Sequence, residues 1–395
     1  MTPDDPGQSG DTIYALSSGA GRAGVAVIRL SGPRVRDVVA GLCGPVPAPR
    51  MVAVRRFVSP ASKEAIDQGV LLWMPGPHSF TGEDVAEFQV HGGRAVIERL
   101  LSALAETGLC RIAEAGEFTR MAFHNCKMDL VAVEGLADLI AADTEAQRQQ
   151  ALFHQFGVAS ERYQALRTRL TATLAHIEAA IDFVDEEGVE EIALGNVHKD
   201  LDGLRRTLTG YLDDDHRGER LRDGVKVVIA GAPNVGKSSL LNALARRDAA
   251  IVSPIEGTTR DAIEVAIDIA GVPCLFVDTA GLRQATTDQI EQLGMARTAQ
   301  HMRDADLTIW VSAPDVPPTD IPALDSDTLR VLNKIDLLDD RSASGQHDMA
   351  LSALDEADVQ TLIDKLAGIV ANRFLDHEPA MITRHRHRVA LENCL

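Results

Sequence analysis

The spacing of apolar residues along the chain changes twice, and each change predicts a different kind of structure. Residues 11–120 hold short β-branched runs that end at Gly or Pro, such as Val25–Leu30 and Gly69–Met74, a pattern typical of strands. Leu and Ile at helical spacing predict a helix over Arg94–Thr107, which ends at Gly108. We therefore expect an α+β domain in this first part of the chain.

Residues 129–222 have helical spacing instead. Almost no Pro or Gly interrupts 131–156 or 160–181, and a further helix is predicted from about Leu194 to Leu212. The clearest amphipathic stripe is formed by Leu166, Leu170, Leu174, Ile177 and Ile181. We interpret the acidic run over 182–188 as a solvated loop, and the whole region as α-helical.

From Val225 onward, strand and helix patterns alternate, which predicts a mostly parallel α/β sheet. The expected strands are Val225–Ala230, Ile263–Ile269, Cys274–Val277, Leu307–Val311 and Leu329–Leu332. The expected helices are Lys237–Arg247, Gln289–Arg303 and Glu356–Arg373. Four prolines within Ser312–Asp327 predict a loop.

Composition agrees with a multidomain globular protein. The chain has 395 residues, of which 45% are hydrophobic and 25% charged, enough for two or three domains. It shows no apolar run long enough to span a membrane and no secretory leader at Met1–Asp5. Five scattered cysteines without a CxxC pair indicate neither disulfides nor a zinc site and favour the cytoplasm. The net charge of −19 argues against broad, non-specific binding to nucleic acid.

Gly231–Ser238 matches the phosphate-loop pattern GxxxxGK[ST] between a predicted strand and a predicted helix. Backbone N–H groups of such a loop surround a β-phosphate. Lys237 is expected to reach the β and γ oxygens, and the Ser238 hydroxyl to ligate Mg²⁺. The predicted nucleotide contacts in this loop are Asn234, Val235, Gly236, Lys237, Ser238 and Ser239.

Further motifs follow in the order expected of a GTPase. Asp278-Thr279-Ala280-Gly281 ends an apolar strand, where Asp278 can hold Mg²⁺ through water and Gly281 can contact the γ-phosphate. Between the two motifs, a switch loop is expected to place Thr259 on Mg²⁺. The contacts predicted there are Ser253, Pro254, Ile255, Glu256, Gly257, Thr258 and Thr259.

Base selection is predicted at Asn333-Lys334-Ile335-Asp336, after another apolar strand. A carboxylate at Asp336 can accept hydrogen bonds from guanine N1 and N2, whereas adenine lacks the N1 proton, so GTP is favoured over ATP. Leu351-Ser352-Ala353 fits the fifth guanine-side loop. Leu282 occupies the position at which Ras-like proteins carry a water-orienting Gln, and Glu291 is a candidate to orient water instead, or else a solvated charge on a helix.

Beyond these motifs the chain resembles the MnmE (TrmE) family of bacterial tRNA-modification GTPases, within the TrmE-Era-EngA-like superfamily, over roughly residues 11–390. The resemblance is carried outside the GTPase motifs by Asp11–Ile13, Gly24–Gly32, Ser79–Asp84, His91–Gly93, Gly116–Phe123, Asn125–Leu130, Glu134–Ile140 and Asp182–Glu187. It implies an N-terminal α+β folate-binding and dimerisation domain at 1–128 and a helical domain at 129–222. A P-loop α/β GTPase domain at 223–375 is then inserted into the helical domain, which resumes at 376–395.

The resemblance also implies ligands for residues that the pattern alone leaves open. Arg29, Glu87 and Lys127 fall on folate-contacting positions, with Glu87 suited to a pterin edge and the two basic residues to an anionic tail. K⁺ activates hydrolysis in the family, and its ligand positions are Asn234, Ser253, Thr258 and the carbonyl of Ile255. Glu291 aligns with the family's water-orienting glutamate. Catalysis is thus expected to involve Glu291, Lys237 and Asp278.

The function implied is GTP hydrolysis coupled to wobble-uridine modification of certain tRNAs. The family acts as a homodimer together with the FAD protein MnmG, and it installs a carboxymethylaminomethyl or aminomethyl group at C5 of the uridine. The one-carbon unit is carried by 5-formyl-tetrahydrofolate or a related folate. The family continues past the position of Leu395 with further helices and a Cys-Ile-Gly-Lys tail, so we expect apolar helix faces to be uncovered near 129–212. Two alternatives remain: a GTP-gated ribosome-assembly factor and a non-catalytic scaffold. For tRNA, some basic surface is expected at Arg384–Arg388.

Overall fold

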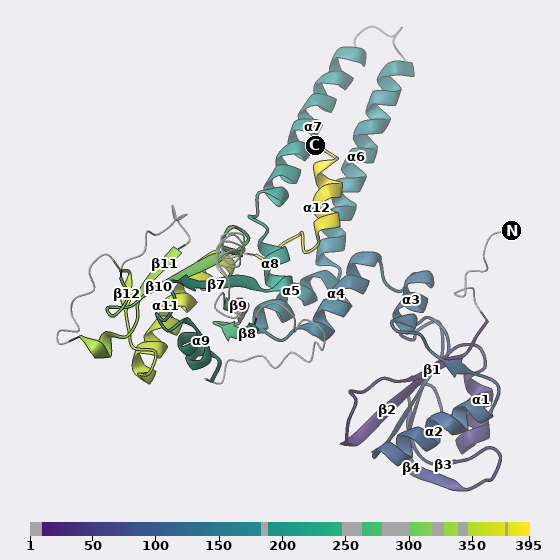
Figure 1. Ribbon diagram of the computed structural model, residues 1–395. Coiled ribbons are helices and arrows are strands. Elements are labelled where there is room, and N and C mark those ends of the chain that lie inside the picture. The colour runs from purple at the N-terminus through teal and green to yellow at the C-terminus, as the bar shows by residue number, and fades with distance from the viewer. Residues whose placement is uncertain are drawn as a thin grey trace, which may run out of the picture. The chain divides into compact units, whose positions relative to one another are not determined.

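The computed structural model describes residues 10–182, 189–246, 263–278, 301–317, 328–338, 347–375 and 378–395. The chain divides into two compact units, Met1–Val133 and Glu134–Leu395, whose elements are labelled in Figure 1. Within the described residues, no helix has the length and apolar character needed to cross a membrane.

The first unit is built on a six-stranded sheet with strand order β3-β4-β5-β2-β1-β6. All neighbours are antiparallel except β1 and β6, which are parallel. Helices α1 and α2 pack their buried residues into the same core as the sheet, so the α+β prediction is confirmed. The bounds are β1 Ile13–Leu16, β2 Ala23–Ser31, α1 Val35–Cys43, β3 Val52–Val58, β4 Ala65–Met74, β5 Val85–Gly92, α2 Arg94–Glu106, β6 Arg111–Ile112 and α3 Glu117–His124.

The helical region has a break that the sequence pattern hid. The helical character expected of residues 131–156 is confirmed, but it is divided between two helices, since α4 ends at Ala141 and α5 begins at Glu145. Thr144 is the N-cap of α5, and a capping box with Gln147 satisfies the first N–H groups of the helix. The bounds are α4 Leu130–Ala141, α5 Glu145–Gln155, α6 Val158–Asp182, α7 Val189–Leu212, α8 Arg217–Asp223 and α12 His385–Glu392.

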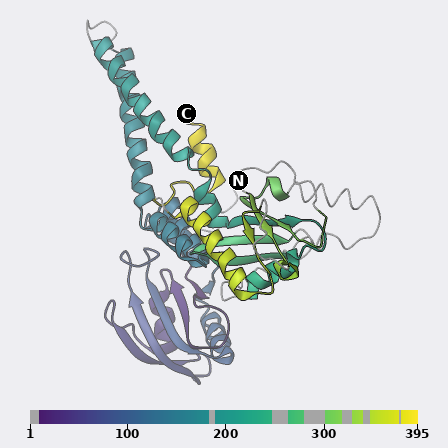
Figure 2. The same ribbon diagram turned by 90° about the vertical axis from the view of Figure 1, so that its left-hand side faces the viewer.

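Helices α6 and α7 form a long hairpin, against which α12 packs (Figure 2). Leu166, Leu204 and Leu208 are buried between them, and Leu391 of α12 joins this cluster. Farther along the hairpin, Leu170 and Leu174 are 40% and 54% exposed, as expected of an apolar stripe that α7 covers only in part.

The second sheet also has six strands, in the order β12-β11-β10-β7-β9-β8. Only β8 runs antiparallel to its neighbour, so the mostly parallel sheet was predicted correctly. Helices α9 and α11 bury their apolar faces in its core. The bounds are β7 Val225–Gly231, α9 Lys237–Arg246, β8 Ile263–Ile269, β9 Val272–Asp278, β10 Leu307–Ser312, β11 Thr328–Leu332, β12 Met349–Ala350 and α11 Glu356–Phe374.

Candidate functional sites

The phosphate loop connects β7 to α9 at the carboxyl edge of the parallel sheet. Gly231 and Gly236 have φ of +144° and +94°, which favours glycine. Close packing adds a second reason: a Cβ on Gly231 would lie 2.1 Å from the carbonyl oxygen of Val311, and one on Gly236 would lie 2.3 Å from Asn333 Nδ2. The loop can therefore bring its backbone N–H groups close to a phosphate.

Lys237 opens α9, and its side chain turns back over the loop. Its Nζ donates to the carbonyl oxygens of Gly231 at 3.1 Å and Ala232 at 2.7 Å, and the residue is only 7% exposed. These contacts hold the ammonium beside the backbone N–H groups of the loop, where a bound polyphosphate can replace the carbonyl oxygens as its partner. Ser238 and Ser239, which follow at the start of α9, are exposed to solvent.

The base-selecting residues meet the phosphate loop through Asn333. Its Nδ2 donates to the carbonyl oxygen of Val235 at 2.9 Å, and its Oδ1 accepts from the N–H of Ala353 at 3.0 Å. Asn333 is 1% exposed. From inside the protein it joins its own loop to the phosphate loop and to the loop over 351–353. The exposed Asp336 accepts a 2.6 Å hydrogen bond from the Ser352 hydroxyl through Oδ1. This orients a carboxylate at the expected guanine position.

Asp278 ends β9 in register with Ile229 of β7, two residues before Gly231. Its backbone thus lies at the same sheet edge as the phosphate loop, as expected of a residue near Mg²⁺. The other predicted GTP, Mg²⁺, K⁺ and water-orienting residues lie outside the described residues. They are Ser253, Pro254, Ile255, Glu256, Gly257, Thr258, Thr259, Thr279, Ala280, Gly281 and Glu291.

In the first unit, Arg29 and Glu87 face each other across β2 and β5. Arg29 Nε and Nη2 both contact Glu87 Oε1, at 2.9 and 2.8 Å. The guanidinium also lies over the rings of Phe80 and Phe118, 5.3 and 5.8 Å from their centroids. Phe80 and Phe118 were not predicted from the sequence, because only the fold brings them to Arg29.

Lys127 contacts the segment over residues 77–82, which also carries Phe80. Its Nζ donates to the carbonyl oxygen of Pro77 at 2.9 Å, while Asn125 Nδ2 donates to that of Thr81 at 2.7 Å. Residues 77–82 therefore connect Lys127 with the Arg29–Glu87 pair. Arg29 and Lys127 thus both contact residues 77–82, and Glu87 is joined to this segment through Arg29.

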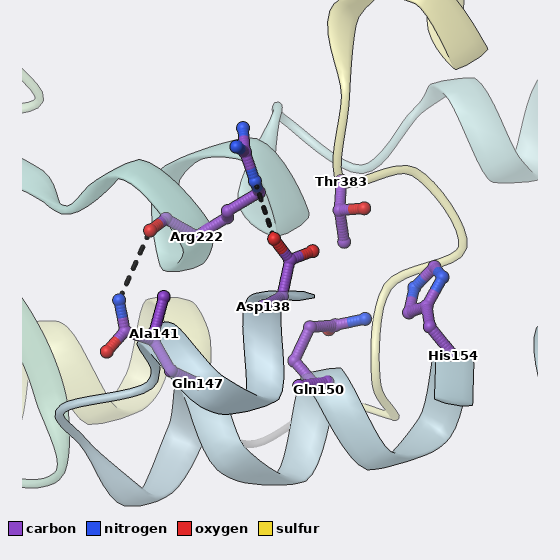
Figure 3. A pocket seen from close by; sticks show the side chains of 8 residues that line it. Asp138, Ala141, Gln147, Gln150, His154, Arg222 and Thr383 are labelled. Carbon is purple, nitrogen blue, oxygen red and sulfur yellow. Dashed lines mark hydrogen bonds and ion pairs between the residues drawn. The ribbon is translucent and has the colours of Figure 1, made fainter. Parts of the chain in front are cut away.

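A cavity of about 100 Å³ lies where α4, α5, α8 and residues 380–384 meet (Figure 3). The Arg222–Asp138 ion pair crosses it at 3.1 Å. Gln150 Nε2 donates to the Ala380 carbonyl at 2.7 Å and its Oε1 accepts from the Ala380 N–H at 2.8 Å, and burial lowers the pKa of neighbouring His154. Because these polar groups bond to one another, we interpret the cavity as a structural junction.

The basic run over 384–388 does not form the free surface expected for tRNA. Arg384 and Arg386 contact Glu134, and Arg384 also contacts Asp138. Arg388 is buried against Asp214 and Glu219. These arginines attach the end of the chain to the helical region. The prediction was wrong for Arg384 and Arg388, which acids far away in sequence neutralise, whereas Arg386 is 51% exposed and its part in a basic surface stays a prediction.

Two models of protein families match the chain. The model for the N-terminus of the GTP-binding protein TrmE matches residues 12–127, and the model for the MnmE helical domain matches residues 130–395. Among the described residues, no three or more His, Cys, Asp and Glu side chains form a group that could hold a metal ion.

Relatives are similar over nearly the whole chain. The tRNA modification GTPase MnmE of Parvibaculum lavamentivorans is 48% identical and covers 97% of this chain and 87% of its own length. The mitochondrial 5-taurinomethyluridine-[tRNA] synthase subunit GTPB3 of Danio rerio is 47% identical, over 92% of this chain and 74% of its own. A solved structure, Era of Aquifex aeolicus bound to GDP·AlF4⁻, is 26% identical over 36% of this chain and 56% of that chain, with a TM-score of 0.28. By its family matches and its relatives, this chain belongs to the MnmE family of tRNA modification GTPases.

Proposed function

We propose that the chain binds GTP at the loop over 231–238 and hydrolyses it with Mg²⁺ and K⁺. The observation that best supports this is the buried Asn333, which bonds to Val235 of the phosphate loop and to Ala353 beside Ser352. Loops distant in sequence thereby present phosphate-binding N–H groups and a carboxylate at one edge of the sheet. Ser238 and Thr259 are the proposed Mg²⁺ ligands, with Asp278 acting through water.

Asp336→Asn should weaken GTP binding at least about 100-fold, because two hydrogen bonds to a charged acceptor are altered and each contributes about 1.5–3 kcal/mol. The amide can instead donate to the O2 of xanthine, so the variant should prefer xanthosine triphosphate. Equilibrium binding of both nucleotides measures the change. Asp364→Asn, an exposed acid on α11, is the control. Unchanged guanine preference in Asp336→Asn would reject the assigned base site.

We propose K⁺ as the charge that assists hydrolysis. Leu282 stands where Ras-like GTPases carry Gln, and a leucine side chain cannot orient or polarise water. A cation between the phosphates neutralises charge that develops in the transition state, as an arginine finger does. Asn234, at φ +64° in the phosphate loop, is the described member of the proposed K⁺ ligand set. Ser253, Thr258 and the Ile255 carbonyl complete it, and Glu291 is proposed to orient water.

We further propose that GTP hydrolysis serves modification of the wobble uridine in certain tRNAs. The zebrafish relative is named as a subunit of a synthase that modifies uridine in tRNA, which supports both the substrate and a second protein, proposed to be MnmG. A homodimer is supported by the edge strand β3, where Val52 and Val54 are 62% and 63% exposed; sedimentation of the chain alone tests it. We place the complex in the cytoplasm, with the partner supplying most of the basic surface for tRNA.

The folate is proposed to bind beside Arg29, Glu87 and Lys127. Arg29 Nε and Nη2 lie 2.9 and 2.8 Å from Oε1 of Glu87, and among the described residues no hydrogen bond reaches Oε2, so it can accept from the N–H groups of a pterin edge. The rings of Phe80 and Phe118 offer flat surfaces next to it, and the ammonium of Lys127 suits the anionic tail.

Glu87→Ala should weaken binding of 5-formyl-tetrahydrofolate about 10- to 100-fold, because a hydrogen bond to a charged group is lost and Arg29 loses its partner. Titration calorimetry of the intact chain measures this. Glu98→Ala removes an exposed glutamate paired with Arg94 in the same unit and should leave the affinity unchanged. Equal affinity in Glu87→Ala would remove Glu87 from the site.

A second candidate is a GTP-gated assembly or scaffold protein. Folate binding separates the two proposals, since a scaffold needs none. Folate bound with Glu87-dependent affinity supports the modification enzyme.

A further inference from the structure

Asp315 occupies a fixed place beside the proposed base site. β10 ends at Ser312, and the chain turns at once through a hydrogen bond from the Val316 N–H to the Ala313 carbonyl, 3.2 Å long. Ala313 is 5% exposed and Val316 packs on the core of the sheet. Both ends of the turn are thus anchored, and Pro314 restricts its backbone further. The Asp315 carboxylate is consequently presented from a rigid support.

The carboxylate is paired with the lysine of the base-selecting motif. Lys334 Nζ lies 2.8 Å from Asp315 Oδ2, and the two side chains are 27% and 43% exposed. A Cβ on Gly236 would lie 4.0 Å from Lys334 Cε, so the lysine stem passes along the phosphate loop before it reaches Asp315. The Lys334 backbone is in the left-handed conformation, with φ +61° and ψ +38°.

We propose that Asp315 is a positioning residue of the guanine site: it holds the Lys334 ammonium so that the lysine stem forms a fixed wall between the phosphate loop and Asp336. This rests on the proposed guanine site. A free lysine side chain samples many rotamers and must be ordered when a base packs against it. The ion pair orders the stem beforehand, and therefore slows escape of the nucleotide.

The dissociation rate of a fluorescent GDP from the full chain tests this. Asp315→Ala should accelerate release about 3- to 10-fold, the range expected for ordering one long side chain. Asp315→Glu should restore much of the retention, and Asp364→Ala on α11 should release GDP as the unmodified chain does. In a Lys334→Met background, Asp315→Ala should have no further effect.

Two results would overturn the inference: unchanged release from Asp315→Ala, or the same acceleration with and without Lys334. The second would indicate a general structural role for Asp315. Asp336→Asn is measured alongside, so that failure of the proposed role of Asp315 can be distinguished from failure of the proposed guanine site. A change of base preference in Asp336→Asn with no effect of Asp315→Ala rejects only the role of Asp315.

Discussion

Lys237→Ala should lower kcat/KM for GTP about 10²- to 10³-fold, the loss typical when one donor to developing transition-state charge is removed. Its ammonium is held 2.7–3.1 Å from the loop carbonyl oxygens of Gly231 and Ala232, within reach of the place proposed for the β and γ oxygens of GTP. Alanine leaves the backbone N–H cradle intact, so GDP affinity should fall less than the rate of hydrolysis. Steady-state phosphate release measures the effect.

Lys226→Ala is the matched control. Lys226 is an exposed lysine on β7, the strand that leads into the same loop, and its removal should change kcat/KM less than twofold. A Lys237→Ala enzyme with nearly full activity, despite normal folding by circular dichroism, would contradict the assigned phosphate site.

Arg388→Ala should release α12 from the helical region. The Arg388 side chain is 6% exposed and contacts Asp214 at 2.6 Å and Glu219 at 3.0 Å, while Nη1 donates to the Leu212 carbonyl at 2.9 Å. Burial lowers the pKa of Arg388, but the ion pairs outweigh this and raise it. Glu219 keeps its contact with His216, but the largely buried Asp214 loses the cation that faces it, and breaking such a pair costs about 3–5 kcal/mol. Amide hydrogen exchange in α12 should become at least about 100-fold faster.

Arg386→Ala is the comparison on the same helix. The Arg386 side chain is 51% exposed, and exposed ion pairs contribute about 0–1 kcal/mol. Exchange in α12 should therefore change only a few-fold. If both variants behaved alike, Arg388 would not be the residue that attaches α12.

The sequence was sufficient wherever local spacing determines structure. The loop over 231–238 was placed between a strand and a helix because its glycines and lysine lie within eight residues. Two strands of the first sheet and five of the second follow from β-branched runs that end at turns. Residues 131–156 were expected to be helical, but the division into two helices at Thr144 was not predicted, because the spacing of apolar residues is helical on both sides of the capping box.

Contacts between distant residues could not be predicted in this way. Asp315 lies in a Pro-rich stretch expected to be a loop, and no local pattern pairs it with Lys334. Phe80 and Phe118 likewise reach Arg29 only through the fold. Arg384–Arg388 was interpreted as a basic surface because the sequence does not show which acids the chain brings opposite these side chains.

This pairing also bears on the net charge of −19. Since Arg384 and Arg388 are neutralised by acids of the same chain, they contribute little free positive charge for tRNA phosphates.

The central claim is that this chain is a K⁺-activated GTPase. The most direct measurement is GTP turnover by the intact chain in KCl and in NaCl at equal ionic strength and equal Mg²⁺. Because K⁺ is proposed to replace an arginine finger, turnover should be at least about 10-fold faster in KCl. Equal rates in the two salts would contradict the claim.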